Sequence, residues 1–199
     1  MSKTFFKASN LSLGYSNQIV LKDLKFELKH DQNYQIVGKN GAGKSTLLNY
    51  ISFNFDGTDF NSEVTRKDVL INQISSTKTL LSDLTLLENI NYFSTNSDLT
   101  EENKVKVLQK YLPSNYLNEK IKNFSNGMIR RAELSIIEIK NPIVFCIDEP
   151  LNFLDYEGVK LFEELIRYRS INQNCNILSS QEYVDIDDFN YEVINLDEY

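Results

Sequence analysis

The stretch that most constrains what this chain can fold into is Gly-Lys-Asn-Gly-Ala-Gly-Lys-Ser-Thr, at residues 38–46. It follows the apolar segment 34–37 and opens a run of helix-forming residues that begins near Gly43. Glycines in such a turn adopt backbone angles that are closed to other residues, so successive N–H groups can point inward and form an anion-binding nest. The positive end of the following helix adds to this attraction. A strand, this turn and a helix in succession indicate a phosphate-binding loop.

The residue types of the loop predict how a nucleotide would be held. Lys44 is expected to reach the β- and γ-phosphates, and the Ser45 hydroxyl is expected to hold Mg²⁺. The residues expected to contact the nucleotide here are Gly38, Lys39, Asn40, Gly41, Ala42, Gly43, Lys44, Ser45 and Thr46. Glycine-rich turns also arise for purely structural reasons, but the full G-x-x-x-x-G-K-[ST] pattern between a strand and a helix favours phosphate binding.

Length and composition bound the remaining possibilities. A chain of 199 residues with 41% apolar and 25% charged residues is long enough for one well-buried α/β domain. No apolar run approaches the roughly 20 residues that span a bilayer, and residues 1–7 have no hydrophobic signal core. We therefore expect a cytoplasmic protein whose membrane role, if any, is exerted through a partner. The net charge of −7 argues against nucleic-acid binding.

Hydrophobic periodicity predicts strands and helices in the following order. Strands are expected within residues 4–13 and at 24–29, 34–37, 69–72, 143–147, 175–178 and 191–196. Helices are expected at about 43–53, 83–93 (with Asp83 as its cap), 100–111, 125–140 (capped by Ser125) and 158–169. Tyr15 is placed in a turn, and the polar residues 54–67 are expected to be rich in turns, with one at Asp56-Gly57. The pattern predicts one domain over residues 1–199, with a helical insert at about 75–140.

Two of these strands differ in their expected surroundings. Residues 24–29 alternate strictly between apolar and polar, as a half-buried antiparallel strand does. Residues 143–147 have no polar interruption, as expected for a central parallel strand covered on both faces. The sheet is therefore expected to be mainly parallel.

The apolar run 143–147 ends in a pair of acidic residues, Asp148 and Glu149. Taken alone, such a pair is a weak signal, but beside a phosphate loop it predicts chemistry. Asp148 would hold Mg²⁺ through water, and Glu149 would orient or deprotonate the water that attacks a phosphate.

In the content and order of its motifs, nearly the whole chain resembles the nucleotide-binding subunit of ATP-binding cassette (ABC) proteins. Residues 38–46 match the Walker A motif of that family, and residues 143–149 match its Walker B motif with the catalytic glutamate. Residues 124–128, Phe-Ser-Asn-Gly-Met, align with the signature motif, whose family form is Leu-Ser-Gly-Gly-Gln. This motif separates the family from other phosphate-loop proteins, such as small-molecule kinases.

The resemblance implies further roles, each with a structural alternative. Tyr15 matches the aromatic residue that stacks on adenine, or it is an ordinary turn aromatic. Gln73 matches the Q-loop glutamine, a Mg²⁺ ligand placed after a strand, or it is a solvated loop amide. Asp155 matches the D-loop, or it is a plain surface charge. Arg130 and Arg131 resemble those of bacterial drug- and peptide-export cassettes, and are expected on a solvated helix face or in helix–helix ion pairs.

By the same resemblance, two cassettes pack head to tail, and the signature motif of each covers ATP held by the Walker motifs of the other. Ser125 would offer a hydroxyl and Gly127 would permit close backbone approach, at the positive end of a helix. The implied ligands are ATP and Mg²⁺, with Ser45, Gln73 and Asp148 as metal ligands. The implied partners are a second cassette, identical or not, and separately encoded membrane subunits at the inner face of the cell membrane.

The chain departs from the family pattern at three points. Asn126 stands where the signature has its first glycine, and its side chain narrows the room for a phosphate. Gln181 stands where the family has a histidine; glutamine can donate a hydrogen bond to the γ-phosphate but cannot carry charge or pass a proton. The segment between Thr46 and Gln73 is short, which predicts a trimmed β-subdomain.

These observations favour the ATP-binding and ATP-hydrolysing subunit of an ABC transporter, an exporter by the resemblance, with Lys44, Glu149 and Gln181 as catalytic residues. Slow hydrolysis is expected because of Gln181. Two alternatives stay open: a soluble ABC ATPase without a transport role, and a weakly catalytic partner in a heterodimer. A simple phosphate-loop kinase would leave residues 124–131 unexplained.

Overall fold

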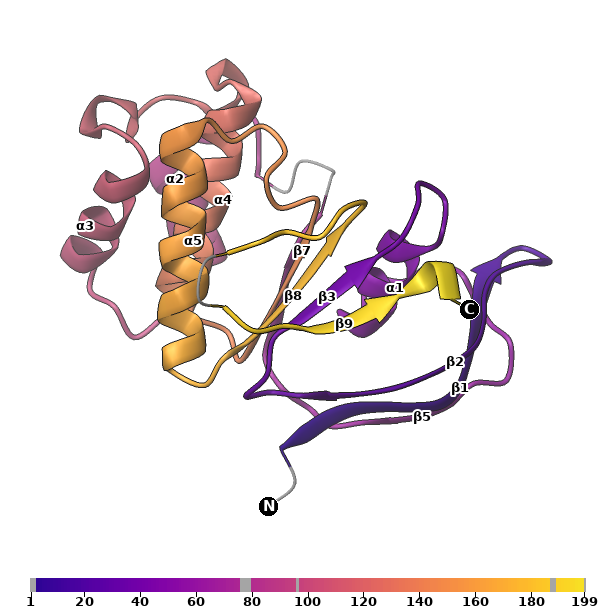
Figure 1. Ribbon diagram of the computed structural model, residues 1–199. Helices are drawn as coiled ribbons and strands as arrows, with labels where there is room; N and C mark the ends of the chain where they lie inside the picture. The colour runs from indigo at the N-terminus through magenta and orange to yellow at the C-terminus, as the bar shows by residue number, and fades with distance from the viewer. Residues whose placement is uncertain (1–2, 76–79, 96, 187–188, 199) are drawn as a thin grey trace. The chain divides into compact units, whose positions relative to one another are not determined.

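The structure is a computed structural model that describes residues 3–75, 80–95, 97–186 and 189–198. Its elements are shown in Figure 1 and follow one another as β1 (Thr4–Tyr15), β2 (Gln18–Lys29), β3 (Tyr34–Val37), α1 (Lys44–Ile51), β4 (Thr58–Asp59), β5 (Glu63–Arg66), β6 (Ile71–Ile74), α2 (Leu86–Phe93), α3 (Glu101–Tyr111), α4 (Asn126–Lys140), β7 (Val144–Asp148), α5 (Tyr156–Ile171), β8 (Cys175–Ser180) and β9 (Glu192–Asn195). Short 3₁₀ turns occupy Ser114–Tyr116, Ile121–Asn123 and Leu196–Glu198. None of the helices in these described ranges is long and apolar enough to cross a membrane.

The chain divides into two compact units. The sheet unit comprises Met1–Ser75, Pro142–Pro150 and Tyr168–Tyr199, and the helical unit comprises Ser76–Asn141 and Leu151–Arg167. The helical unit thus includes most of α5 in addition to the predicted insert. The assignment of residues 1–199 to a single domain stays a prediction.

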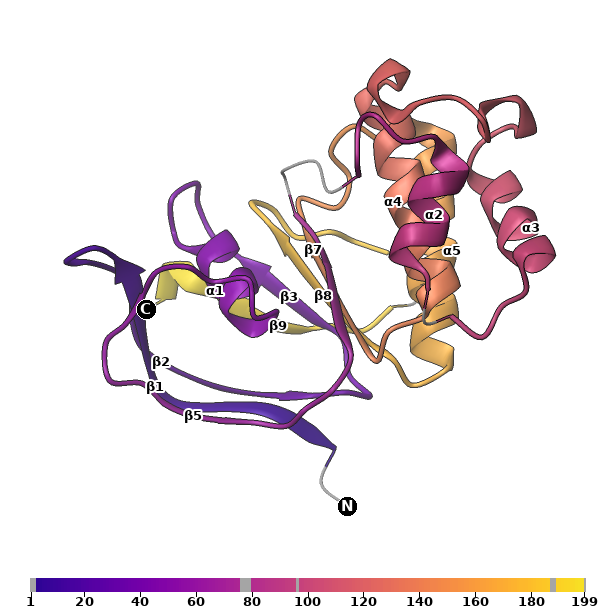
Figure 2. The same ribbon diagram turned by 180° about the vertical axis from the view of Figure 1, so that it is seen from behind.

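A five-stranded parallel sheet forms the centre of the sheet unit, in the strand order β6-β7-β8-β3-β9. β7, β8 and β3 run side by side in Figures 1 and 2. Every residue of β7 and β8 is buried. The prediction of a central parallel strand at 143–147 is therefore confirmed, because only a strand covered on both faces tolerates such an uninterrupted apolar run.

A second, antiparallel sheet has the order β2-β1-β4, and β5 also pairs with β1. The antiparallel strand predicted at 24–29 is confirmed within the longer β2. The turn placement of Tyr15 was wrong, and two strands within the turn-rich segment 54–67 were not predicted. Tyr15 ends β1 and pairs with Gln18, and residues 54–67 contain β4 and β5. β4 and β5 are polar and lack the hydrophobic pattern by which strands are recognised in a sequence. They are held by hydrogen bonding to β1, which the sequence does not reveal.

The core of the sheet unit joins both sheets to α1. Leu47, Leu48 and Ile51 of α1 are fully buried with residues of β1, β2, β3, β7 and β8. Each such side chain contributes on the order of 1.5–3 kcal/mol through burial. The short helix is therefore held by packing on both sides, which fixes the phosphate loop that precedes it.

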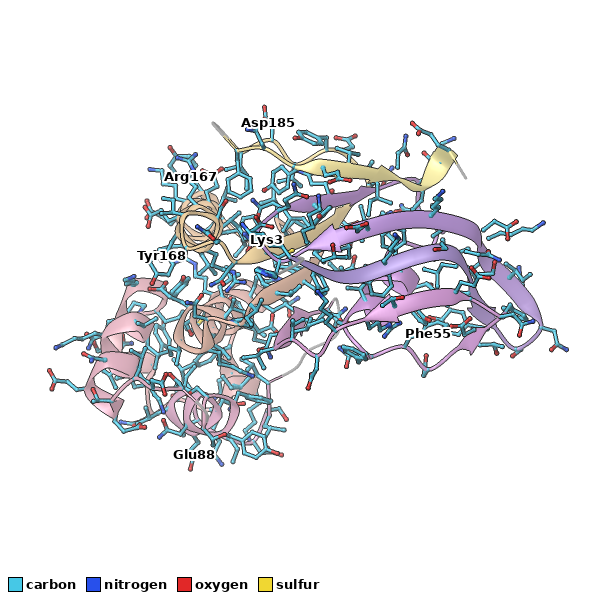
Figure 3. The ribbon with its side chains drawn as sticks, turned by 90° about the horizontal axis from the view of Figure 1, so that it is seen from below. Lys3, Phe55, Glu88, Arg167, Tyr168 and Asp185 are labelled. Carbon is cyan, nitrogen blue, oxygen red and sulfur yellow. The ribbon has the colours of Figure 1, made fainter. Side chains whose placement is uncertain are left out.

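The helical unit is built on capped helices. Ser125 caps α4, as predicted, and α4 ends at Asn141 in a left-handed conformation. The predicted helix at about 100–111 is α3, and its cap is Thr100. The cap of α2 is Thr85 rather than Asp83: its side chain accepts from the Glu88 N–H, and Glu88 (labelled in Figure 3) accepts in return. Such a reciprocal capping box satisfies two helix-end donors, and one aspartate two residues earlier cannot.

Candidate functional site

The loop at residues 38–43 connects β3 to α1 and requires glycine. Gly41 and Gly43 have φ angles of 85° and 96°, in the left-handed region. A Cβ atom on Gly43 would lie 2.5 Å from the Leu21 Cδ2 atom, so the Leu21 side chain would have to shift to admit one. The backbone can therefore turn sharply into the first helical residue, Lys44.

Lys44 lies inside this loop, with 6% of its surface exposed. Its Nζ atom donates to the carbonyl oxygens of Gly38 and Lys39, at 2.8 and 3.1 Å. These hydrogen bonds go to neutral carbonyl oxygens, and hydrogen bonds from an ammonium group to an anion would be about twice as strong. The loop thus surrounds one buried positive charge.

Asp148, the last residue of β7, bridges α1 and β8. The Ser45 hydroxyl donates to its Oδ2 atom at 2.7 Å, and the Ser179 hydroxyl donates to its Oδ1 atom at 2.5 Å. Asp148 is 4% exposed. A hydroxyl that gives its proton to a carboxylate keeps its lone pairs for another partner. Ser45 and Asp148 therefore present hard oxygen donors side by side.

These donors fit Mg²⁺. That ion prefers oxygen ligands, and in nucleotide sites it takes one or two protein oxygens while phosphates and water complete the octahedron. A serine hydroxyl in contact with a buried carboxylate supplies such a pair.

Glu149 follows Asp148 with a φ angle of 49°, unusual for a residue with a side chain. Its N–H donates to the Ser179 carbonyl oxygen at 2.8 Å, which holds this conformation. Burial raises the pKa of its carboxyl, the charge of Asp148 raises it further, and Lys44 opposes the shift. A raised pKa makes a carboxylate a better proton acceptor near neutral pH.

A cavity of about 250 Å³ brings these groups together. It is lined by Val20, Asn40, Gly41, Gly43, Lys44, Ser45, Thr46, Asp148 and Glu149. A second cavity of about 350 Å³ shares Val20 and Asn40 with the first, and its other lining residues are Leu21, Lys22, Lys39, Ala42, Leu196 and Asp197. The sequence did not predict that Val20, Lys22 and Asp197 line these cavities. They belong to no phosphate-loop pattern and reach the site only through tertiary packing.

Gln73 lies elsewhere in the sheet unit. It is part of β6 rather than after a strand, so its predicted placement was wrong. Its Oε1 atom accepts from the Ser52 hydroxyl and from Asn54, and its Nε2 atom donates to Asn49 at 2.7 Å. These partners lie at or beyond the C-terminal end of α1, away from Ser45 at its start. This geometry does not bring the amide to Ser45 and Asp148, the other predicted metal ligands, and its metal role stays a prediction.

Tyr15 lines neither cavity. It is 40% exposed, and its ring meets the edge of Phe55 at 5.6 Å between centroids (Phe55 is labelled in Figure 3). Its stacking on a base stays a prediction.

Gln181 follows β8 in a segment that is held by hydrogen bonds on both sides of this residue. Before it, the Ser180 hydroxyl donates to the Glu182 carbonyl. After it, the fully buried Gln35 side chain donates to the Val184 carbonyl and accepts from the Val184 N–H at 2.9 Å. Gln181 itself is exposed and lines neither cavity, and its contact with a phosphate stays a prediction.

In the helical unit, the structure places Ser125 and Gly127 at the start of α4. The Ser125 side chain accepts from the Met128 N–H at 3.2 Å. A Cβ atom on Gly127 would lie 2.7 Å from the Phe153 carbonyl oxygen, so glycine allows that loop to pass close by. Asn126 is the first residue of the helix. Their contacts with a partner's nucleotide stay predictions.

The two arginines of α4 form ion pairs. Arg131 pairs with Asp155, which also accepts from the Gly158 N–H near the start of α5. The hydrogen bond from Arg131 is the main reason that the pKa of Asp155 is lowered. Arg130 is 3% exposed and meets Glu133 of its own helix at 3.5 Å. A solvated position for Arg130 was therefore wrong, since a buried guanidinium needs a partner.

Comparison with known proteins identifies relatives over most of the chain. The family model described as ABC transporter matches residues 21–152. The lantibiotic transport ATP-binding protein SrtF of Streptococcus pyogenes is 28% identical over 201 residues, which cover 94% of this chain and 86% of that protein. The cytochrome c biogenesis ATP-binding export protein CcmA of Vibrio vulnificus is 25% identical over 189 residues, which cover 88% of this chain and 91% of that protein.

Solved structures share the fold. A putative ABC transporter ATP-binding protein from Pyrococcus furiosus superposes with a TM-score of 0.80 at 20% identity, covering 98% of each chain. A dimeric ATP-binding cassette in a post-hydrolysis state, bound to ADP and phosphate, gives a TM-score of 0.79 at 19% identity, covering 96% of this chain and 93% of that one. This likeness confirms the predicted fold class, a phosphate-loop NTPase of ABC type with a mainly parallel sheet, an antiparallel sheet and a helical part.

Proposed function

Because this chain belongs to the ABC transporter family, we propose that it is the ATP-binding and ATP-hydrolysing subunit of an exporter. The observation that carries the proposal is the convergence of Lys44, the Ser45–Asp148 pair and Glu149 on one cavity. A buried ammonium group, two hard oxygen donors and a carboxylate with a raised pKa are the groups that phosphoryl transfer requires.

ATP binding would use the loop as it stands. The ammonium of Lys44 would exchange the carbonyls of Gly38 and Lys39 for β- and γ-phosphate oxygens, a gain because charge-assisted hydrogen bonds are stronger. Ser45 and Asp148 would hold Mg²⁺, which neutralises phosphate charge when bound. Loop N–H groups and the start of α1 would contribute further positive potential.

Hydrolysis would depend on Glu149. Its carboxylate would orient a water molecule in line with the γ-phosphorus and accept a proton from it as the new P–O bond forms. The bond between the γ-phosphorus and the β–γ bridging oxygen breaks, and ADP and phosphate are released. The left-handed backbone at Glu149, held by the Ser179 carbonyl, would aim the side chain.

The finer parts of the proposal concern partners. A second cassette would place its Ser125 and Gly127 over the nucleotide, and closure and reopening of this dimer would drive separate membrane subunits at the inner face of the cell membrane. The dimeric cassette structure of the same fold supports the first step. The export direction is supported by the names of the relatives, a lantibiotic transport protein and an export protein.

The test compares wild-type protein with Lys44→Ala, and uses Lys106→Ala, an exposed lysine of α3, as the matched control. We expect ATP binding and hydrolysis in the wild type and in the control, and loss of both in Lys44→Ala. If Lys44→Ala binds ATP as tightly as the wild type does, the proposal is wrong. Purification from native membranes should recover a hydrophobic partner chain, and recovery only from the soluble fraction would favour a non-transport ATPase.

A second candidate function is a weakly catalytic partner in a heterodimer. It is favoured by Gln181 in place of a histidine and by Asn126 at the first position of α4. Glu149, in contact with the Ser179 backbone, opposes it. The ATPase rate of the purified chain alone distinguishes the two functions.

A further inference from the structure

One buried serine of β8 contacts both acidic residues of the site. Ser179 is fully buried and lies opposite Asp148 in the register of β7 and β8. Its hydroxyl donates to the Asp148 Oδ1 atom at 2.5 Å, and its carbonyl oxygen accepts from the Glu149 N–H at 2.8 Å. The Ser179 side chain therefore holds the Asp148 carboxylate, and the Ser179 backbone holds the Glu149 backbone.

We propose that Ser179 is a positioning residue for Mg²⁺, acting through the Asp148 carboxylate. This inference rests on the proposed function. A carboxylate rotates about its Cβ–Cγ bond unless both of its oxygens are held. Ser45 holds one oxygen of Asp148 and Ser179 holds the other. The hydroxyl of Ser45 is itself expected to ligate the metal, whereas Ser179 is a donor that stays outside the coordination sphere.

The consequence is a carboxylate aimed at the cavity before the metal arrives. With its Oδ1 atom bound to Ser179, Asp148 presents its Oδ2 atom toward Ser45 and the phosphate loop. Groups that orient metal ligands in this way commonly account for about 10–100-fold in metal affinity. Ser180, the next residue, has a different role, because its hydroxyl donates to the Glu182 carbonyl.

The experiment measures metal dependence separately from nucleotide binding. Variants Ser179→Ala and Ser179→Thr are compared with wild type, with Ser94→Ala as the control. Ser94 is also fully buried, but its hydroxyl donates to the Ile90 carbonyl in α2. A fluorescent ATP analogue is bound first without metal, and Mg²⁺ is then titrated while the change in nucleotide affinity is followed. Mn²⁺ binding to the nucleotide complex, measured by electron paramagnetic resonance, provides a second readout.

For Ser179→Ala we expect unchanged metal-free nucleotide affinity and a Mg²⁺ midpoint raised about tenfold, with a matching loss of Mn²⁺ affinity. Ser179→Thr keeps the hydroxyl and should restore the midpoint, and Ser94→Ala should not alter it. A Mg²⁺ midpoint that is unchanged in a folded, nucleotide-binding Ser179→Ala protein would overturn the proposal. A loss of metal-free binding and of thermal stability together would also overturn it, because that pattern marks a purely structural serine.

If Ser179→Ala does not fold, Ser179→Cys carries the test, since the thiol has a similar shape but donates weakly. It should raise the Mg²⁺ midpoint in the same direction, and an unaltered midpoint counts against the proposal. Failure of the proposed function gives a different result, because the wild type itself would then bind no nucleotide.

Discussion

At the scale of single residues, Glu149 has two features that disfavour the folded state: its backbone conformation and the environment of its carboxylate. Its left-handed backbone is strained by about 1–2 kcal/mol relative to ordinary angles. Burial and the neighbouring Asp148 charge also disfavour its ionised form. A residue that is costly in both respects points to function, because packing alone would select a glycine or a neutral side chain there.

This cost predicts a pH-dependent stability difference for Glu149→Gln. The pKa of Glu149 is raised in the folded state, so the stability it contributes is present below its unfolded value and is lost as pH rises through the folded value. The glutamine variant cannot ionise, and it should be more stable than wild type at pH 7, with a difference that shrinks toward pH 4. Thermal unfolding across this pH range checks the sign. Glu63→Gln, at an exposed position in β5, controls for the lost charge.

Gln181 gives a second prediction at this scale. Replacing it with histidine restores a side chain that can carry charge at the γ-phosphate, and a single such contact is commonly worth on the order of 10²-fold in rate. We expect Gln181→His to raise the rate of ATP hydrolysis substantially. Gln109→His, on the exposed side of α3, should leave the rate unchanged. No gain in the steady-state rate would show that the missing histidine does not limit turnover.

At the scale of elements, the fully buried Gln35 of β3 holds the segment after β8 by bonding both polar groups of the Val184 peptide. In Gln35→Leu the Val184 N–H and C=O would be left without these bonds inside the core. We expect a loss of about 1–3 kcal/mol in the free energy of unfolding. Hydrogen exchange at Val184 should also accelerate.

The control for this change is Ile36→Val, in the same strand and fully buried. It removes one methylene group, which costs about 0.5–1.5 kcal/mol without touching a hydrogen bond. Urea denaturation and hydrogen exchange of both variants separate the two effects. Unchanged protection of Val184 in Gln35→Leu would mean that the segment is held by Val184 and Ile186 packing alone.

At the scale of the whole molecule, the proposed cycle predicts an ATP-dependent dimer. Glu149→Gln should bind ATP and Mg²⁺ but not hydrolyse ATP, so the closed dimer accumulates. Light scattering during size-exclusion chromatography should then report twice the mass of the chain, 23.1 kDa, only when ATP is present. Adding Lys44→Ala to this variant should abolish the dimer. Hydrolysis by Glu149→Gln at the wild-type rate would show that Glu149 does not direct the water.

Much of the candidate site could be read from local sequence. Residues 38–46 form the expected loop and the first helical turn after it, the apolar run at 143–147 is the buried central strand, and Ser125 caps α4. These features are local, because turn chemistry, burial on both faces and helix capping depend on residues within a few positions of one another. The convergence of Ser45 and Asp148 also followed, since Asp148 ends one parallel strand of the sheet and Ser45 follows the loop after another.

Other features depended on contacts between distant segments. Gln73 lies within β6 and bonds to residues at the end of α1, and β5 exists because β1 pairs with it. Ser179 faces Asp148 only because β7 and β8 are neighbours in this register. The sequence by itself determined the phosphate loop and the family, because their patterns are short and their chemistry allows few substitutes. The tertiary structure decided which distant side chains serve that loop, because strand register and packing are set by the whole core rather than by any local pattern.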